Sequence, residues 1–268
     1  MDESVQNRPR LTKPVDPHEI KLAGEVQKLL MPKSSPLSNW CSMFARNRMA
    51  DVLGGDFYDF IELADGCQVV LVGDVTGHGL HASVVMSLMY GFIHHAARES
   101  CNPNPVVTDL NAFLRSFAKR SELLDHYFSA TLFFGVVDPR TLTMHYVNAG
   151  HPAGLVRRGD ELLRLPATSH PVGYFDQAHF RTGVFHFTSV DRFLLYTDGL
   201  INCTNQQEEM FGSRRLDETF RSFSGDHMLF LDRLFAEIDQ FQAGQSSFDD
   251  CTAVVMDFHK RSVEKEPF

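Results

Sequence analysis

The first regular pattern of hydrophobic positions predicts a helix over about 17–31. Asp16 can cap its start, Pro17 suits the first helical position, and Pro32 follows its end. The apolar stripe of this helix consists of Ile20, Leu22, Val26, Leu29 and Leu30. The stripe must be covered, either by the domain to which the helix belongs or by another subunit or signalling partner, and the sequence leaves both open.

Three strands and two helices are expected next. Apolar runs predict strands at CSMFA, FYDFIEL and CQVVLVGDV, all between Asn39 and Val75. Hydrophobic residues at helical spacing then predict two helices, over 80–99 and over 105–124. Asn104 can cap the second of these helices.

A second block rich in strands follows these helices. FSATLFFGVV and TLTMHYVNAG form a hairpin that turns at Asp138-Pro139, and further strands are expected at PAGLVRR, GVFHFT and RFLLYT. A helix over about 226–241 and a last strand at CTAVVMDF come after them. Because strands and helices occur in blocks and do not alternate, the order is α+β rather than that of a doubly wound sheet.

Composition narrows the class of protein. With 268 residues, 43% of them hydrophobic and 22% charged, the chain suits a single globular domain of the soluble type. Its formal net charge of −9 argues against a nucleic-acid-binding protein, which needs clustered Lys and Arg. No membrane partner is expected, because the longest apolar stretch, around 84–93, is too short to span a bilayer and the N-terminus lacks the apolar core of a signal peptide.

The chain has five cysteines, Cys41, Cys67, Cys101, Cys203 and Cys251, which lie far apart in the sequence. An odd number of cysteines without a C-x-x-C pair is typical of free thiols in a reducing compartment. We therefore expect free thiols and a cytoplasmic location.

The hairpin at Ala64-Asp65-Gly66 carries the first candidate site. Counted outward from this turn, Asp56 falls opposite Asp74 or one residue away from it. Cross-strand partners lie about 5 Å apart, and two like charges there destabilise the sheet unless a cation lies between them. The turn DVTGHG, which contains Asp74, exposes backbone carbonyls, so the two carboxylates indicate an oxygen-liganded ion such as Mg²⁺ or Mn²⁺.

Aspartates flank two more apolar strands. Asp198 follows RFLLYT and precedes Gly199, and Asp249 and Asp250 stand directly before CTAVVM. Each of them alone could be a turn or strand-end cap, where Asp is common. Together with the hairpin, these acidic positions come from three separate segments and could converge on one cluster, although periodicity alone does not show that they do.

Seven motifs occur in a fixed order, namely QKLLMP, GGDFYDF, VGDVTGHG, NAGHPAGLV, LLYTDGL, MFGSRRL and DDCTAVVM. This order resembles the SpoIIE/RsbU branch of the metal-dependent (PPM-type) serine/threonine phosphatases, from about Gln27 to Phe258. The resemblance implies an αββα sandwich of two antiparallel β-sheets flanked by helices. It also implies a PPM-type phosphatase domain over 39–260, with a flexible N-terminus and regulatory helix over 1–38 and a tail over 261–268.

The resemblance further implies a centre of two or more divalent cations, Mn²⁺ or Mg²⁺. By similarity, Asp74 bridges two ions, the backbone carbonyl of Val75 joins the first, and Asp198 and Asp249 hold the second. Asp56 completes the site directly or through water. Through these aspartates the ions would activate a water molecule for attack on the phosphoryl group.

Two features of this site stay open at the level of sequence. Either Asp249 or Asp250 could be the inner ligand. His78 and His151 lie within the motifs, and either could protonate the leaving group. A structural role, or one beyond the inner metal shell, is favoured for both, because neither occupies the position of the acid histidine of the eukaryotic relatives, where this chain has Thr76.

The function expected from the resemblance is hydrolysis of phosphoserine or phosphothreonine on a regulatory protein, a phosphorylated STAS-type anti-anti-sigma factor. An activating partner or a homodimer contact at the helix over 17–31 would shift the two helices after DVTGHG and so complete the metal site. The alternatives are a phosphatase for a small-molecule phosphoester and a catalytically silent regulator that keeps the PPM fold for partner binding. Retention of all the carboxylates argues against the silent regulator.

Overall fold

The computed structural model describes residues 16–97, 102–245 and 249–260, so the predicted lead-in before Asp16 and the predicted tail over 261–268 lie outside it. The apolar runs form two five-stranded antiparallel sheets. Sheet A has the order β1-β10-β9-β6-β7, with β1 (Cys41–Arg48), β6 (Gly154–Arg158), β7 (Glu161–Leu165), β9 (Arg192–Tyr196) and β10 (Cys251–Phe258). Sheet B has the order β2-β3-β4-β5-β8, with β2 (Asp56–Glu62), β3 (Gln68–Val75), β4 (Ala130–Asp138), β5 (Thr143–Ala149) and β8 (Gly183–His186).

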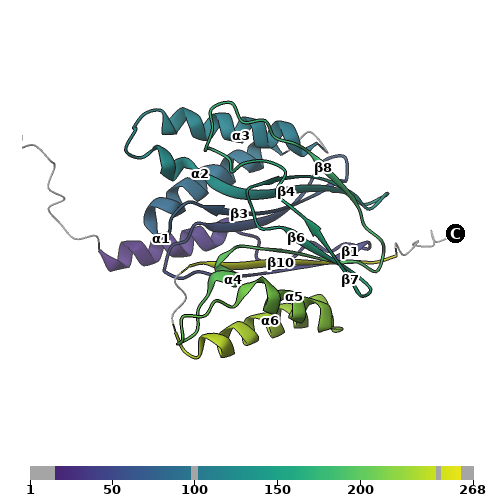
Figure 1. Cartoon of the computed structure of the whole chain (residues 1–268). Helices are drawn as coiled ribbons and strands as arrows, with labels where there is room; N and C mark the ends of the chain where they lie inside the picture. Colours follow the sequence, from purple (N-terminus) through teal and green to yellow (C-terminus); the bar gives the residue numbers. More distant parts are fainter. Residues whose placement is uncertain (1–15, 98–101, 246–248, 261–268) are drawn as a thin grey trace, which may run out of the picture.

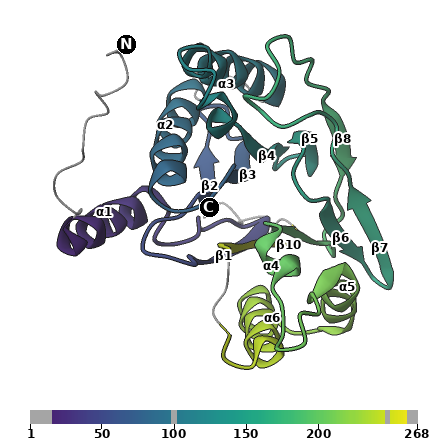
Figure 2. The same cartoon turned by 60° about the vertical axis from the view of Figure 1, so that its left-hand side comes forward.

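The two sheets pack face to face, and helices cover both outer faces (Figures 1 and 2). Sheet B carries α2 (Leu80–Ala96) and α3 (Pro103–Ala118), and sheet A carries α5 (Gly212–Ser222) and α6 (His227–Gln242). The described ranges also contain two short helices, η1 (Asp125–Phe128) and α4 (Gly199–Asn202). The αββα sandwich predicted from the resemblance is confirmed. None of the helices in the described ranges is long and apolar enough to cross a membrane.

Three hydrophobic layers hold this arrangement together. Phe133 and Phe193 belong to the layer between the sheets, Leu71 and Met86 to the layer under α2 and α3, and Phe235 to the layer under α6. Each of these side chains is at most 1% exposed, and full burial of one such side chain contributes about 1.5–3 kcal/mol. Because both faces of the central strands are buried, β3, β9 and β10 are continuous apolar runs rather than alternating ones.

The second helix after the DVTGHG turn differs from its prediction at both ends. It begins at Pro103, and its cap is Asn102, whose side chain accepts a hydrogen bond from Asn104 N over 3.1 Å. The prediction of Asn104 as the cap is wrong, because Pro103 already occupies the first helical position. The helix ends at Ala118, six residues before the predicted 124.

The cysteines also differ from their prediction. Cys41 and Cys203 are buried free thiols, but Cys67 is disulfide-bonded. The prediction of free thiols is therefore wrong for Cys67. Separation along the sequence does not measure separation in the fold, so it could not exclude a disulfide.

Helix α1 (Pro17–Leu30) lies beside the sandwich and next to α2 (Figure 2). The side chain of Asp16 caps it and accepts a hydrogen bond from His18 N over 2.9 Å, as predicted. Its apolar stripe, in contrast, is largely uncovered, since Leu22, Val26 and Leu29 are 58%, 54% and 62% exposed. The described part of the domain does not cover these three side chains.

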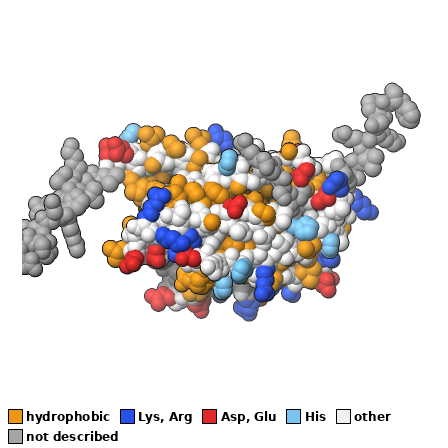
Figure 3. Space-filling model, turned by 90° about the horizontal axis from the view of Figure 1, so that it is seen from above, with side chains coloured by type: hydrophobic (Ala, Val, Ile, Leu, Met, Phe, Trp, Pro, Cys, Tyr) orange, Lys and Arg blue, Asp and Glu red, His pale blue; other side chains and the backbone are white. Residues whose placement is uncertain are grey.

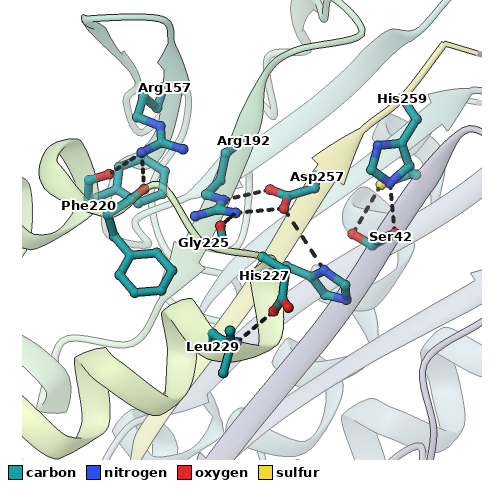
Figure 4. Close-up of polar contacts among 12 residues, drawn as sticks. Ser42, Arg157, Arg192, Phe220, Gly225, His227, Leu229, Asp257 and His259 are labelled. Atoms are coloured by element: carbon teal, nitrogen blue, oxygen red, sulfur yellow. Dashed lines mark hydrogen bonds and ion pairs between the residues drawn. The ribbon is translucent and has the colours of Figure 1, made fainter.

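A buried arginine connects the outer helices to the far end of sheet A (Figure 4). Arg192 Nε and Nη2 donate to the carboxylate of Asp257 over 2.6 and 2.7 Å, and Nη2 also donates to Gly225 O over 2.6 Å. Arg157, opposite Arg192 in the neighbouring strand, donates to Phe220 O over 3.3 Å at the end of α5. These contacts hold the α5–α6 turn on the sheet, at the end of β10 opposite to its N-terminal aspartates.

Candidate active site

The predicted pairing in the first hairpin is confirmed. Asp56, at the start of β2, lies directly opposite Asp74, near the end of β3. On its other side, Asp74 lies opposite Thr131 of β4. Asp56 is buried and Asp74 is partly exposed, so the two carboxylates lie at the rim of sheet B with one of them within reach of solvent.

Two threonines from sheet A hold Asp56. Thr197 Oγ1, directly after β9, and Thr252 Oγ1, in β10, donate to Asp56 Oδ2 over 2.7 and 2.6 Å. Asn47 Nδ2 in turn donates to Thr252 Oγ1 over 2.8 Å. Both threonines are fully buried. Asp56 therefore connects the two sheets, and one of its oxygens accepts two hydroxyl hydrogen bonds.

Gly199 allows the segment that carries Asp198 to lie against the start of β10. A Cβ atom added to Gly199 would lie 2.0 Å from Asp250 O and 3.2 Å from Asp249 Cβ, so only glycine leaves enough room. The adjoining backbone is paired as well, since Thr197 N donates to a β10 carbonyl over 3.0 Å. Close backbone approach thus brings two acidic segments together.

Asp250 and Asp249 have different hydrogen-bond partners. Asp250 is buried, its Oδ1 accepts from Ala50 N over 2.8 Å, and its Oδ2 accepts from Gly55 N over 2.9 Å and from Asp56 N over 3.4 Å. Asp249 is partly exposed, and its Oδ1 accepts from the Asp250 amide over 2.9 Å. Both oxygens of Asp250 therefore bind the backbone before β2.

The carboxylates of the cluster repel one another. Burial and the charges of Asp198, Asp249 and Asp250 raise the pKa of Asp74 to about 8. Burial, and after it the charge of Asp74, raises the pKa of Asp56 well above its usual range. The hydrogen bonds from Thr252 and Thr197 lower this pKa but do not outweigh the increase. Burial first, with further contributions from Asp198 and Asp250, also raises the pKa of Asp249. Acidic side chains from three segments thus share one electrostatic neighbourhood.

The donor set of this cluster fits a divalent cation. Within the described residues, no Lys or Arg forms an ion pair with Asp56, Asp74, Asp198 or Asp250. Nor do three His, Cys, Asp or Glu side chains in these ranges form a group that could hold a metal ion alone. Mg²⁺ typically uses one or two carboxylates and keeps several waters, so backbone carbonyls and water would complete its coordination. The Val75 carbonyl, one residue after Asp74, is an oxygen donor of this kind.

The two histidines of the motifs lie in different surroundings. His151 is buried, with Nδ1 2.9 Å from Thr131 Oγ1, and its Nε2 has no hydrogen-bond partner among the residues that the structure describes. Burial lowers the pKa of His151 to about 3, although the nearby backbone of Tyr196 acts to raise it. The ring is therefore neutral at neutral pH. His78 is exposed and lies close enough to Asp249 to oppose the increase in its pKa.

Thr197 and Thr252 are site residues that the sequence analysis missed. Each lies within a recognised motif, LLYTDGL or DDCTAVVM, but threonine is also common in strands for its β-branched side chain. The only signal in the sequence was proximity, because Thr197 directly precedes Asp198 and Thr252 follows Asp250 by two positions. The role of both threonines depends on their hydrogen bonds to Asp56, which lies more than 140 residues away in the sequence.

We expect the metal-free protein to lose stability as the pH rises from about 6.5 to 8. Asp74, with a pKa of about 8 in the folded state, holds a proton there that the unfolded chain has lost, so rising pH favours unfolding. This residue alone should lower the free energy of unfolding by about 1.5 kcal/mol over the range. His151 does not oppose the effect, because unfolded histidine is mostly neutral above a pKa of about 6.5.

Urea unfolding in EDTA at the two pH values measures this change. Asp74→Asn should remove most of the pH dependence, since asparagine does not titrate. A wild-type stability that stays constant or increases over the range would show that Asp74 is not held in this like-charge cluster.

Two curated proteins and one solved structure illustrate what the chain is similar to. It is 26% identical over 261 residues to protein IcfG of Synechocystis sp., covering 89% of this chain and 41% of IcfG. It is 28% identical over 189 residues to the phosphoserine phosphatase RsbP of Bacillus subtilis, covering 69% of this chain and 46% of RsbP. The chain thus spans less than half the length of these two relatives.

The SiaA-PP2C domain of Pseudomonas aeruginosa has the same fold, with a TM-score of 0.79 at 23% identity, covering 90% of this chain and 96% of that domain. The sequence model of the family described as stage II sporulation protein E (SpoIIE) matches residues 64–259, which is more than half of the chain. This range includes Asp74, Asp198, Asp249 and Asp250, and it begins after Asp56. The chain therefore belongs to the SpoIIE family, with the fold of the PP2C phosphatase domains.

Proposed function

We propose that this chain is a metal-dependent phosphatase that hydrolyses phosphoserine or phosphothreonine on a regulatory protein. The observation that carries the proposal is the acidic cluster, in which Asp56, Asp74 and Asp249 have raised pKa values through burial and mutual repulsion. Such a cluster destabilises the fold unless a cation binds it, so its presence is better explained by a metal site than by stability. The family and a relative named phosphoserine phosphatase support the reaction class.

The cluster would hold two or more divalent cations, Mn²⁺ or Mg²⁺. Asp74, the Val75 carbonyl, Asp198 and Asp249 would hold these ions. Asp56, oriented by its two threonine donors, would complete the site directly or through water. Bound cations would lower the pKa of a water molecule and compensate the charge that develops on the phosphoryl oxygens.

The remaining polar residues would support the site rather than react. Asp250 would hold the backbone before β2 in place, because both of its oxygens accept backbone amides. His151 is unsuited to donate a proton, since it is buried and neutral at neutral pH. His78 is exposed and near Asp249, but no hydrogen bond from the part of the chain that the structure describes orients it, so neither histidine is proposed to be catalytic.

A phosphorylated STAS-type anti-anti-sigma factor is the proposed substrate, in the cytoplasm. Support for the substrate comes from the RsbU-type resemblance and from the phosphoserine activity in the name of RsbP. No nucleic acid is expected to take part, because the net charge of −9 opposes binding to phosphate backbones.

A substrate panel tests the proposal. Purified protein with Mn²⁺ should hydrolyse p-nitrophenyl phosphate and should hydrolyse a phosphorylated STAS protein and phosphoserine peptides with a higher kcat/KM than phosphorylated metabolites. EDTA should abolish the hydrolysis of every substrate in the panel. Faster turnover of a metabolite would identify a small-molecule phosphatase instead, and absence of any hydrolysis with Mn²⁺ or Mg²⁺ would identify a silent regulator.

We further propose that α1 receives an activating partner or a second copy of the chain. Leu22 and Val26 line an apolar groove together with Leu80, Val84 and Leu88 of α2. Hydrophobic side chains are gathered on this side of the molecule (Figure 3). Helix α2 begins directly after the turn that contains Asp74, so a contact that shifts α2 would also move that turn.

Deletion of residues 1–32 should therefore change turnover by about fivefold or more, as is typical of coupling between two sites. The measurement is kcat with p-nitrophenyl phosphate and Mn²⁺, together with the molar mass by light scattering. Deletion of residues 1–15 is the matched control, because it leaves α1 in place. Unchanged kinetics and an unchanged oligomeric state after deletion of 1–32 would exclude a regulatory role for α1.

A further inference from the structure

The attachment of α1 to the domain depends on two buried residues, Gly24 and Gln27. A Cβ atom added to Gly24 would lie 2.6 Å from Val52 O, so the helix approaches the loop before β2 more closely than any residue but glycine allows. Gln27 is 3% exposed, although most of its neighbours in α1 are exposed. A buried amide is costly unless it is hydrogen-bonded, so the partners of Gln27 are informative.

Gln27 binds both backbone groups of one residue, Gly54. Its Nε2 donates to Gly54 O over 2.7 Å, and Gly54 N donates to Gln27 Oε1 over 3.2 Å. A primary amide offers a donor and an acceptor side by side, which matches the N–H and C=O of a single residue. Gln27 therefore satisfies two buried backbone groups that no regular secondary structure pairs.

Gly54 lies between Gln27 and Asp250, a member of the acidic cluster. A Cβ atom added to Gly54 would lie 2.1 Å from Asp250 Oδ2, the oxygen that also accepts from Gly55 N. Gly55 O accepts from Val75 N over 3.4 Å, and a Cβ atom added to Gly55 would lie 3.0 Å from Val75 O. The Gly54–Gly55 segment thus contacts α1 on one side and two predicted site residues on the other.

We propose that Gln27 is a positioning residue for the metal site. Through Gly54 it fixes the segment that leads into Asp56, binds Asp250 and borders the Val75 carbonyl, so the position of α1 sets the affinity of the site for cations. This path runs directly from α1 to the loop before β2 and does not require a shift of α2. It rests on the proposed function, because it concerns the cation affinity of the same acidic cluster.

The full chain with Gln27→Met tests the proposal, because methionine keeps the length and volume of glutamine and removes both hydrogen bonds. We expect the dissociation constant for Mn²⁺, measured by isothermal titration calorimetry, to increase by about tenfold or more, as when an outer partner of a metal ligand is lost. With p-nitrophenyl phosphate, the Mn²⁺ concentration for half-maximal rate should rise, and saturating Mn²⁺ should restore most of kcat. In the metal-free protein, the amides of residues 49–56 should exchange faster with deuterium.

Lys28→Ala is the matched control, since Lys28 is exposed on the same turn of α1 and its ion-pair partner within the described residues is the exposed Glu25. Gln27→Glu provides a second variant that keeps an acceptor for Gly54 N but opposes Gly54 O, and it should weaken Mn²⁺ binding in the same direction. A Gln27→Met or Gln27→Glu protein that folds, binds Mn²⁺ as wild type does and exchanges residues 49–56 at the wild-type rate would overturn the proposal. If wild type itself bound no Mn²⁺, the proposed function would fail, and amide exchange alone would still decide whether Gln27 holds the segment.

Discussion

Asp74→Asn is expected to reduce hydrolysis of p-nitrophenyl phosphate by about 1,000-fold or more, because it removes the negative charge of a residue that would hold the cations. Asparagine keeps the size of the side chain, so the loss would come from charge and coordination rather than from packing. The metal-free variant should be at least as stable as wild type, since the substitution removes a carboxylate whose pKa burial and three neighbouring aspartates raise to about 8.

Steady-state kinetics with Mn²⁺ and thermal unfolding in EDTA measure these two effects. Asp160→Asn is the control, since Asp160 is exposed in the turn between β6 and β7, and it should keep wild-type activity. An Asp74→Asn protein with substantial activity, or one that is strongly destabilised without metal, would show that Asp74 has a structural role instead.

Substitutions of Asp249 and Asp250 are expected to separate metal binding from stability. Asp249→Asn should weaken Mn²⁺ binding by about 100-fold or more with little change in metal-free stability, because its side-chain contact to the Asp250 amide can be kept. Asp250→Asn should instead destabilise the metal-free protein by about 1–3 kcal/mol. Its amide nitrogen would face either Ala50 N or Gly55 N, and two donors cannot bond to each other.

Isothermal titration with Mn²⁺ and urea unfolding in EDTA distinguish the two residues. The expected pattern assigns the inner ligand to Asp249 and the support of the loop before β2 to Asp250. The reverse pattern, with normal Mn²⁺ affinity in Asp249→Asn and a stable Asp250→Asn protein that binds no metal, would exchange these roles.

Most of the fold could be predicted from local patterns. The pairing of Asp56 with Asp74 followed from the turn at Ala64-Asp65-Gly66, because a short hairpin loop sets the register of both strands. Where the local signal is weak, prediction missed elements. Strand β7 is a half-exposed edge strand of five residues, and helix α5 buries only Leu216, Thr219 and Phe220.

A smaller part of the candidate site than of the fold could be predicted from the sequence. Its aspartates could be named because acidic residues beside apolar strand ends are visible in the sequence, and the resemblance joined them into one site. The threonines that hold Asp56 were missed, because their role depends on two strands of the other sheet. Periodicity reports which face a residue shares with its neighbours and not which distant residue it contacts.

The sequence by itself determined the order of the strands and helices, the hairpin that pairs two aspartates and the family to which the chain belongs. Only the tertiary structure decided that Asp250 binds the backbone of a loop 200 positions away, and that α1 is seated by Gly24 and Gln27 while its apolar stripe stays exposed. The physical reason is that hydrophobic patterning and turn chemistry act over a few residues, whereas a buried polar group takes its partners from whichever backbone the fold brings within hydrogen-bonding distance.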